Sequence, residues 1–327
     1  MKYLITGANG FIGNCLTKTL LEKGHSVRCL IRKESDLTQL KDLPLEYYTG
    51  SLLEPSSLLP ALDGVDYIFN FAGKTRALKN SEYFQTNALG AKNLFQAAQE
   101  ACPKIKRILH VSSLAAAGPS QTTNPLTEED PPHPVTPYGE SKLESEKIAH
   151  SFSDLLPITI IRPPVVYGPS DKSGFALFKS AAKGLNISIG NRNPLLMPIY
   201  VQDLVNAAYH LAHAPAAVGE TFFVCGAEIT SPAELFKILS SAVNLNSPPR
   251  TIQIPPLLAA SAVFCLELRA QLVRRPNRLN SAKLTELKYP AWLASSKKAT
   301  SLGVEHKTTL SQGLLQTLTW YQNAGWL

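Results

Sequence analysis

Cysteine is scarce in this chain and never forms a C-x-x-C pair. The five cysteines are scattered along the sequence: Cys15, Cys29, Cys102, Cys225 and Cys265. This spacing argues against a disulfide framework and against a zinc site, so we expect a reducing, cytoplasmic compartment. His210 and His213 are three apart on an expected helix, but no third ligand is spaced to join them, so no metal is expected.

Long apolar runs are also missing. The longest, 255–266, is broken only by Ser261 and is shorter than the roughly 18 to 20 residues of a membrane-spanning helix. The chain starts with Met1-Lys2 and enters a strand-like run at once, which leaves no room for a signal peptide. Apolar residues make up 44% and charged residues 17% of the 327 positions, a globular composition for one large or two modest domains.

Short runs rich in Val, Ile and Tyr alternate with helix-length segments through the first half of the chain. We expect strands at 2–6, 26–31, 45–48, 66–71, 108–112 and 158–161, and helices at 11–23, about 81–101 and about 137–152. This alternation is typical of a parallel sheet with helices on both faces. The sequence therefore predicts a doubly wound, Rossmann-type α/β fold.

The alternation of strand-like and helical segments becomes irregular after residue 161, where prolines and glycines cluster. We expect a sheet domain at 1–165, rejoined by 199–226, and a smaller, mostly helical C-terminal lobe at 166–198 and 227–327. The rejoining segment would hold a helix at 201–214 and a strand at 220–224. The closing helix has apolar residues at helical spacing: Leu310, Leu314, Leu315, Leu318 and Tyr321.

A glycine-rich turn joins the first expected strand to the first expected helix. It reads Thr6-Gly7-Ala8-Asn9-Gly10-Phe11-Ile12-Gly13. Side chains at these glycines would keep the backbone from approaching a pyrophosphate, and the free N–H groups and helix dipole favour negative charge there. One glycine alone fits a plain left-handed turn. Three in this context predict a dinucleotide site that includes Gly7, Asn9, Gly10, Phe11, Ile12 and Gly13.

The residues after the second expected strand bear on which dinucleotide binds. NAD sites usually carry an acid here that accepts from the ribose 2′-OH, whereas this chain has Arg32 and Lys33. A guanidinium and an ammonium suit a 2′-phosphate, so we predict NADP(H) rather than NAD(H). The alternative is that Arg32 only pairs with a neighbour, because Glu34 and Asp36 follow closely.

A second group of residues suggests acid–base chemistry. Ser112 and Ser113 follow the fifth expected strand, and Tyr138 and Lys142 are four apart, on one face of a helix. A free tyrosine has a pKa of about 10, and a nearby ammonium favours the phenolate. We therefore expect Lys142 to lower the pKa of Tyr138, and the Ser113 hydroxyl to hold a substrate oxygen.

In this order the motifs resemble those of extended short-chain dehydrogenases/reductases, the NAD-dependent epimerase/dehydratase family. The resemblance covers nearly the whole chain and rests on the three glycines, Asn70-Phe71-Ala72-Gly73, Asn87-Ala88-Leu89-Gly90, Ser112-Ser113, Tyr138-x-x-x-Lys142, 162–169 and 199–203. It implies an oxidoreductase whose sheet domain binds the nucleotide and whose C-terminal lobe binds a small-molecule substrate.

By position, the resemblance implies a role for each residue of the site. Tyr138 would be the general acid–base, Ser113 would orient and polarise the substrate oxygen, and Lys142 would bind the nicotinamide ribose. Asn87 would support the central helix or, as the less favoured alternative, join a proton path, and Asp203 would be structural. The further cofactor contacts implied are Ala72, Gly73, Asn87, Ser112, Pro163, Val165 and Val166. A homodimer through the two long helices beside the sheet is also implied.

Departures from the family pattern narrow the reaction. Leu114 and Ala115 stand where dehydratases carry an Asp-Glu pair, so loss of water from a sugar is not expected. Segment 193–199 is mostly apolar where nucleotide-sugar epimerases have arginine and polar residues, and Ala116-Ala117-Gly118 leaves room for an apolar substrate. We predict NADP(H)-dependent interconversion of a ketone and a secondary alcohol. The alternatives are a nucleotide-sugar epimerase with transient oxidation and a non-catalytic NAD(P)-binding regulatory protein.

Basic charge is concentrated towards the carboxyl end. Between Leu266 and Lys307 there are nine basic residues, Arg278 among them, and three acidic ones, against a formal net charge of +7 for the chain. No nucleic-acid motif accompanies them, so no nucleic-acid partner is expected and a solvated face is the simplest interpretation. The apolar stretch 252–272 fits a buried helix of the lobe, the favoured interpretation, or an interfacial helix in peripheral contact with an anionic membrane.

Overall fold

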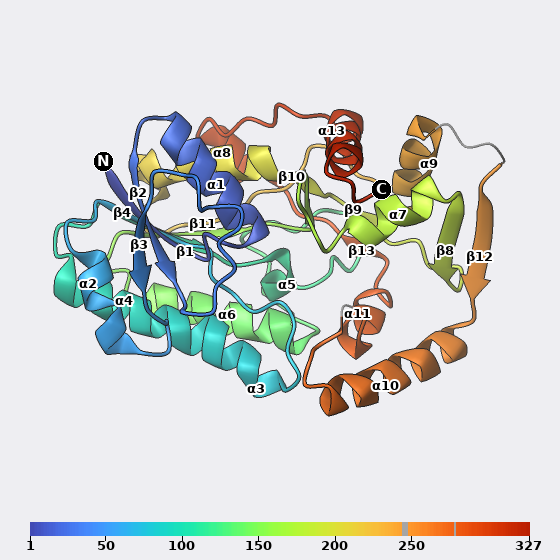
Figure 1. Cartoon of the computed structure of the whole chain (residues 1–327), viewed down its shortest axis with the longest axis horizontal. Coiled ribbons are helices and arrows are strands. Elements are labelled where there is room, and N and C mark those ends of the chain that lie inside the picture. The colour runs from blue at the N-terminus through green and yellow to red at the C-terminus, as the bar shows by residue number, and fades with distance from the viewer. Residues whose placement is uncertain (244–247, 278) are drawn as a thin grey trace.

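A seven-stranded parallel sheet forms the centre of the computed structural model (Figure 1), which describes residues 1–243, 248–277 and 279–327. Arg278 therefore lies outside the described residues. The strands are β1 (Lys2–Thr6), β2 (Ser26–Ile31), β3 (Glu46–Thr49), β4 (Tyr67–Asn70), β5 (Arg107–Val111), β6 (Ile158–Arg162) and β11 (Thr221–Phe223). They are ordered β11-β6-β5-β4-β1-β2-β3, and every neighbouring pair is parallel. The predicted doubly wound α/β fold is confirmed.

Helices cover both faces of this sheet because strand residues alternate between the faces. On one face, α1 (Phe11–Glu22) and α8 (Val201–His213) share a buried cluster with Tyr3 and Ile5. On the other face, α2 (Leu59–Leu62), α4 (Gly90–Ala101) and α6 (Pro137–Ser151) share a second cluster with Leu4. A 3-10 turn, η1 (Pro55–Ser57), leads into α2.

The expected helix at 81–101 is a helical segment of three parts. It begins as α3 (Asn80–Tyr83), widens into the π-helical turn η2 (Phe84–Leu89), and continues as α4. A π turn inside a helix changes the direction in which its residues point and is frequent at functional sites. Here the π turn carries Asn87.

The strand order reverses between β1 and β4. From β1 the chain proceeds through β2 and β3 in one direction, and β4, β5 and β6 follow in the other. Ligands of open parallel sheets bind outside the carboxyl ends of the strands at such a reversal. The glycine turn after β1 and the segment after β4 both lie at this edge.

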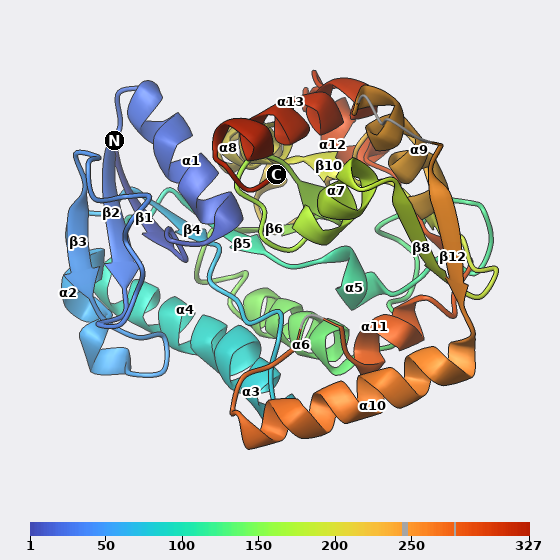
Figure 2. The ribbon, with the colours of Figure 1, turned by 45° about the vertical axis from the view of Figure 1, so that its right-hand side comes forward.

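The remaining elements, most of which follow β6 in the chain, lie beside the sheet (Figure 2). They are α5 (Leu114–Ala117), β7 (Val166–Tyr167), α7 (Phe175–Ala182), β8 (Leu185–Ile189), β9 (Leu195–Leu196), β10 (Ile199–Tyr200), η3 (Pro215–Ala217), α9 (Pro232–Ala242), β12 (Arg250–Ile254), α10 (Pro256–Leu272), α11 (Ser281–Glu286), β13 (Ala291–Trp292), α12 (Lys297–Ser301) and α13 (Leu310–Asn323). Three parallel strand pairs, β10–β7, β12–β8 and β13–β9, join distant segments. The division into two domains stays a prediction.

The closing helix α13 is amphipathic, with one correction. Leu310, Leu314, Leu318 and Tyr321 are buried against α7 and α9, but Leu315 is exposed. Leu315 directly follows Leu314, about 100° further round the helix, so both cannot face the same core.

All five cysteines are free, with no disulfide between them. Among the helices in the described ranges, none has the length and apolarity to cross a membrane.

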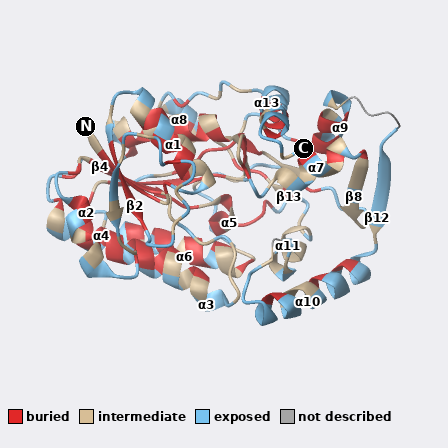
Figure 3. Ribbon diagram, in the orientation of Figure 1, coloured by how far each residue is buried: buried red, intermediate tan, exposed pale blue. Residues whose placement is uncertain are grey.

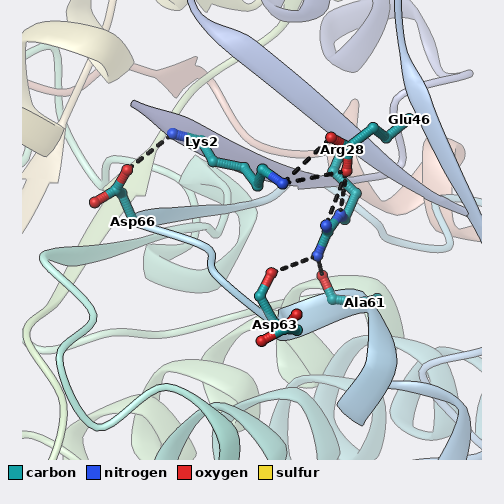
Figure 4. A network of polar contacts seen from close by, with 6 residues as sticks. All are labelled: Lys2, Arg28, Glu46, Ala61, Asp63 and Asp66. Carbon is teal, nitrogen blue, oxygen red and sulfur yellow. Dashed lines mark hydrogen bonds and ion pairs between the residues drawn. The ribbon is translucent and has the colours of Figure 1, made fainter.

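A network of hydrogen bonds and ion pairs joins β1, β2 and β3, near their amino ends, to the loop before β4 (Figure 4). Arg28 donates from Nε to Glu46 at 2.9 Å, and from one terminal nitrogen to the carbonyl groups of Ala61 at 2.9 Å and Asp63 at 2.7 Å. The Asp66 carboxylate accepts from the Lys2 backbone N–H at 2.9 Å. This end of the sheet is thus held by paired groups.

Candidate functional site

The glycine turn brings the end of β1 into contact with the end of β4. Gly7 has a φ of +72°, and a Cβ there would lie 2.8 Å from the Ala72 nitrogen, so only glycine fits. A Cβ on Gly13 would lie 2.2 Å from the Gly7 carbonyl oxygen, which shows how closely α1 packs on the turn. The structure thus explains two of the three glycines by packing alone.

Gly10 is different, because it opens the first helix towards solvent. It is exposed together with Asn9, it is the N-cap of α1, and no side chain caps the helix there. The half-buried Phe11 and Ile12 follow in the first turn. A helix N-terminus with uncapped N–H groups and no Cβ in front suits a phosphate group. The residues present therefore fit a dinucleotide pyrophosphate.

Ala72 and Gly73 continue this edge after β4. The Thr6 hydroxyl accepts from the Ala72 N–H at 3.1 Å. A Cβ on Gly73 would lie 3.4 Å from Asn87 Oδ1 and 3.9 Å from Lys142 Nζ. Gly73 therefore lies beside the predicted ribose-binding lysine and leaves space in front of it.

Asn87 holds the π turn to the helix that carries Tyr138. Its Oδ1 accepts from the Lys74 N–H at 2.7 Å, and its Nδ2 donates to Ser141 Oγ at 2.9 Å. Ser141 in turn donates to the Tyr138 carbonyl oxygen at 2.7 Å. These contacts are those of a supporting residue, and a direct cofactor contact by Asn87 stays a prediction.

Tyr138 and Ser113 are brought together by a close approach of α6 and α5. A Cβ on Gly139 would lie 2.2 Å from the Ala115 carbonyl oxygen, so glycine next to Tyr138 permits the contact. Ser113 is the N-cap of α5, and its Oγ accepts from the Ala115 N–H at 3.1 Å. The Ser113 hydroxyl also lies close enough to Tyr138 to act on the pKa of its phenol. The predicted hydroxyl pair is therefore assembled.

The expected lowering of the Tyr138 pKa by Lys142 is wrong. Burial raises the pKa of Tyr138 to about 12; the Ser113 hydroxyl acts in the opposite direction, and the Glu286 charge adds to the rise. The Lys142 ammonium instead donates to the Val111 carbonyl oxygen at 2.6 Å. Burial also lowers the pKa of Lys142 to about 8, while the Glu146 charge raises it. Desolvation dominates both groups.

A buried ion pair supports Lys142 one helical turn further along α6. The Glu146 carboxylate accepts from Arg162 Nε at 2.9 Å and from a terminal nitrogen at 2.7 Å, a bidentate pair. Both side chains are buried. Because Arg162 is the last residue of β6, this pair fixes the position of α6 relative to the end of that strand.

A chain of buried hydrogen bonds, which the sequence analysis missed, links the glycine turn to α6. Thr6 donates to Asn70 Oδ1 at 2.7 Å, Asn70 Nδ2 contacts His110 Nδ1 at 3.0 Å, and His110 Nε2 contacts Ser145 Oγ at 3.0 Å. Ser145 donates to the Lys142 carbonyl oxygen at 2.7 Å. The order of donors places the imidazole proton on Nε2, and burial holds the pKa of His110 well below its usual value.

The remaining predicted contacts lie along the ends of β5 and β6. Ser112 is buried, and within the described residues its Oγ has no hydrogen-bond partner. The Pro163 carbonyl oxygen accepts from the Leu114 N–H at 2.8 Å, and that of Val165 from the Ile199 N–H at 2.9 Å. The Val165 side chain is exposed and that of Val166 is half-buried. These residues border the same edge as Ser113.

Arg32 and Lys33 follow β2 and are exposed. Arg32 Nε lies 3.7 Å from Glu34 Oε1, so the alternative pairing with a neighbour is present in the structure. Both side chains are mostly exposed, 67% for Arg32 and 73% for Glu34, and such a pair contributes little. It leaves the guanidinium able to turn towards an anion beside the glycine turn.

Three other predicted polar residues belong to the structure around the site. The Asp203 carboxylate accepts from the backbone N–H groups of Lys307 at 3.4 Å and Thr308 at 3.0 Å. His210 Nε2 contacts the Leu302 carbonyl oxygen at 2.6 Å, and His213 Nε2 contacts the Tyr3 hydroxyl at 2.9 Å. Across the described ranges, no three His, Cys, Asp or Glu side chains are grouped to hold a metal ion.

The chain is similar to known proteins along its length. A model of the NAD dependent epimerase/dehydratase family matches residues 3–226. The chain is 27% identical to a ceramide reductase of Caulobacter vibrioides, over 99% of this chain and 95% of that protein. It is 28% identical to sterol demethylase protein B of Methylococcus capsulatus, over 99% of each. Its fold matches the UDP-glucose 4-epimerase of Thermotoga maritima, solved with UDP-glucose, with a TM-score of 0.82 at 21% identity over 99% of each chain.

Proposed function

The chain belongs to the NAD-dependent epimerase/dehydratase family and is an enzyme of the extended short-chain dehydrogenase/reductase type, and from this premise we propose that it reduces an apolar ketone with NADPH. The observation that carries the proposal is the close placement of Ser113, whose hydroxyl acts on the Tyr138 phenol, together with Lys142 beside Gly73 at the same sheet edge. A regulatory protein without turnover has no need of this arrangement.

Each side chain has a task that follows from its surroundings. A nicotinamide nucleotide, when bound, would supply the hydride chemistry. Ser113 donates to the substrate oxygen and orients it. Tyr138 transfers a proton to that oxygen as it gains negative charge. Lys142, whose pKa is about 8, is mostly cationic at neutral pH and would hold the ribose hydroxyl groups.

The protonation of Tyr138 favours the direction of reduction. With its pKa raised to about 12, the phenol is protonated at neutral pH and is ready to donate. Oxidation of an alcohol would require the phenolate, which burial disfavours. Alkaline conditions should therefore favour the reverse reaction.

The preference for NADPH rests on the basic pair after β2. Arg32 and Lys33 follow the strand whose end lies beside Thr6, since Thr6 pairs with Leu30 in the sheet register. The weak, exposed contact with Glu34 leaves Arg32 free to bind a 2′-phosphate in two-point geometry. Dissociation constants for NADPH and NADH test this, and equal or tighter NADH binding would refute it.

An apolar substrate suits the wall next to Ser113. Leu114 and Ala117 are buried in a cluster with Ala294, against which Met197 and Trp292 pack. No carboxylate follows Ser113 to expel a hydroxyl group. The two similar proteins named above are, by name, a ceramide reductase and a sterol demethylase component, which agrees with a lipid-like substrate class.

The direct test is the consumption of NADPH with a panel of ketones of increasing apolar size. We expect a net fall in absorbance at 340 nm with apolar ketones, coupled to formation of the secondary alcohol. No net change, together with interconversion of a nucleotide sugar, would instead indicate an epimerase. Binding of the nucleotide without any turnover on either panel would indicate a regulatory protein.

A further inference from the structure

Helix α10 lies at the outer side of the C-terminal lobe, with α11 packed against its inner side (Figures 1 and 2). Only Ala259, Val263 and Ala270 are buried in it. Their spacing of four and seven residues places them on one stripe of the helix. The expectation that 252–272 is a buried helix is therefore wrong, because most of α10 is exposed (Figure 3).

The face turned away from the protein carries large apolar side chains. Leu257 is 78% exposed, Phe264 62% and Leu272 84%, and Leu268 is exposed on the same side. These residues are spaced by seven, four and four, so they form one stripe opposite the buried Ala259, Val263 and Ala270. An isolated exposed leucine is ordinary, but an apolar stripe along a 17-residue helix marks an interaction surface.

Positive charge borders the carboxyl end of this stripe. Arg269, Arg274 and Arg275 are exposed, and the backbone turns at Arg274, which has a φ of +50°. The acid on this helix faces inward: Glu267 Oε1 accepts from the Ser281 N–H of α11 at 2.8 Å. The outer side therefore combines apolar and basic residues, as a helix at an anionic lipid surface does.

The inner side of α10 borders a cavity of about 320 Å³. Ala270 and Gln271 form one wall, and Tyr83 and Pro137 lie on the other. The Tyr83 ring stands edge-on to that of Tyr138, with 6.1 Å between their centroids. The cavity thus lies between α10 and a neighbour of the proposed acid–base residue.

We propose that α10 docks on the surface of an anionic lipid bilayer, with its outer apolar stripe in the headgroup–acyl boundary and its arginines on lipid phosphates. A second copy of the chain is a poorer occupant, since it would bring another net charge of +7 to the same face. The added inference that a lipid-like ketone enters through the cavity rests on the proposed function. The docking itself does not.

Vesicle flotation tests the docking without cofactor or substrate. At low salt, we expect the full chain to float with vesicles of phosphatidylcholine and phosphatidylglycerol and to stay behind with phosphatidylcholine alone. The variant Leu257→Gln/Phe264→Gln/Leu272→Gln should lower the bound-to-free ratio at least tenfold. Arg269→Gln/Arg275→Gln should lower it on anionic vesicles and remove most of its salt dependence.

Matched controls separate the stripe from general surface effects. Leu155 is 59% exposed and lies outside α10, so Leu155→Gln should float like the wild type. Because the three varied residues of α10 are exposed, the triple variant should keep the wild-type melting temperature and NADPH affinity. A loss of folding would show in those two measurements.

Cys265 gives a second, direct readout. It is the exposed cysteine of α10, whereas Cys15 is half-buried and Cys29, Cys102 and Cys225 are buried, so it can be labelled selectively. An environment-sensitive fluorophore on Cys265 should shift to the blue with anionic vesicles, and spin-labelled lipid should quench it. An unchanged spectrum with bound vesicles would overturn the placement of this face in the lipid.

Two results would overturn the proposal as a whole. One is the absence of flotation at low salt; the other is a triple variant that floats like the wild type. If the wild type does not float and sediments as a dimer that the triple variant breaks, the stripe covers a second copy instead. Failure of the proposed reduction is seen separately, with a short water-soluble ketone and no vesicles, so either idea can fail alone.

Discussion

The two ends of the central sheet use the same kinds of residue in opposite ways. At the amino ends, the buried Arg28 side chain donates hydrogen bonds to Glu46 and to two backbone carbonyl groups. Four residues later on the same segment, Arg32 is exposed with one weak contact at 3.7 Å. The first arginine holds the fold together, and the second is the one that we propose binds the nucleotide.

The same contrast holds for the polar groups near the carboxyl ends. There, burial moves the pKa of Tyr138 up to about 12 and that of Lys142 down to about 8. Ser112 Oγ is buried and, in the part of the chain described, unpaired. The desolvated Lys142 ammonium and the unpaired Ser112 hydroxyl lower stability, and perturbed groups of this kind are frequent at functional sites. We therefore expect mutations at the two ends of the sheet to affect stability and activity differently.

The largest expected effect concerns activity alone. Tyr138→Phe removes the proton donor while keeping the ring, so turnover should fall by about 10²- to 10⁴-fold. The melting temperature and NADPH affinity should change little. Tyr83→Phe is the matched control, because Tyr83 touches Tyr138 edge-on and should keep turnover within a few-fold. Near-normal turnover of Tyr138→Phe with nucleotide bound would contradict the acid–base role.

The next effect concerns stability alone. Arg28→Met keeps the apolar stem but leaves the Ala61 and Asp63 carbonyl oxygens without their donor. We expect the free energy of unfolding to fall by about 2 to 3 kcal/mol, measured by urea denaturation. The ratio kcat/KM at a permissive temperature should stay near wild type. Equal losses of stability and activity would show that the two ends are not separate.

Lys142 is expected to affect both activity and stability. Its folded pKa of about 8 lies below its unfolded value of 10.5, so between these pH values the unfolded chain binds more protons. Stability should therefore rise with pH in that window, by up to about 2 kcal/mol from pH 8 to 10 relative to Lys142→Met. Denaturation of both proteins at several pH values measures this. Parallel curves would mean that the ammonium is not desolvated.

Much of the sheet and of the site could be predicted from the sequence because the signals are local. The runs of Val, Ile and Tyr predict each strand of the sheet, and each predicted end lies within one residue of the observed end. The glycine turn and the Tyr138–Lys142 spacing are short motifs whose geometry follows from one strand, one turn or one helix. The structure assembles Ser113 with Tyr138 and sets Gly73 beside Lys142.

What escaped prediction depends on contacts between distant segments. The series of hydrogen bonds through Asn70, His110 and Ser145 runs from β4 to α6, and no residue spacing in the sequence predicts it. The pKa of Tyr138 was misjudged because burial outweighs a neighbouring charge, and burial is a property of the whole fold. The outer face of α10 is apolar in composition, and only its position shows that it is exposed.

The smallest expected effect returns to the two arginines and tests their difference most sharply. Arg32→Met should leave the free energy of unfolding within about 0.5 kcal/mol, because the side chain is exposed and weakly paired. Its loss should weaken NADPH binding about tenfold, since a charge-assisted contact to a phosphate is worth roughly 1.5–3 kcal/mol and Lys33 still supplies part of it. NADH binding should hardly change.

Glu34→Gln is the matched control for this last prediction. It releases Arg32 from its 3.7 Å contact, so NADPH binding should be unchanged or slightly tighter. Titration of both nucleotides against all three proteins separates the outcomes. If Arg32→Met weakens NADH and NADPH equally, the guanidinium acts on a part that both nucleotides share, such as the pyrophosphate. If neither changes, Arg32 is a surface residue like its neighbours, and the contrast between the two ends of β2 concerns packing and not recognition.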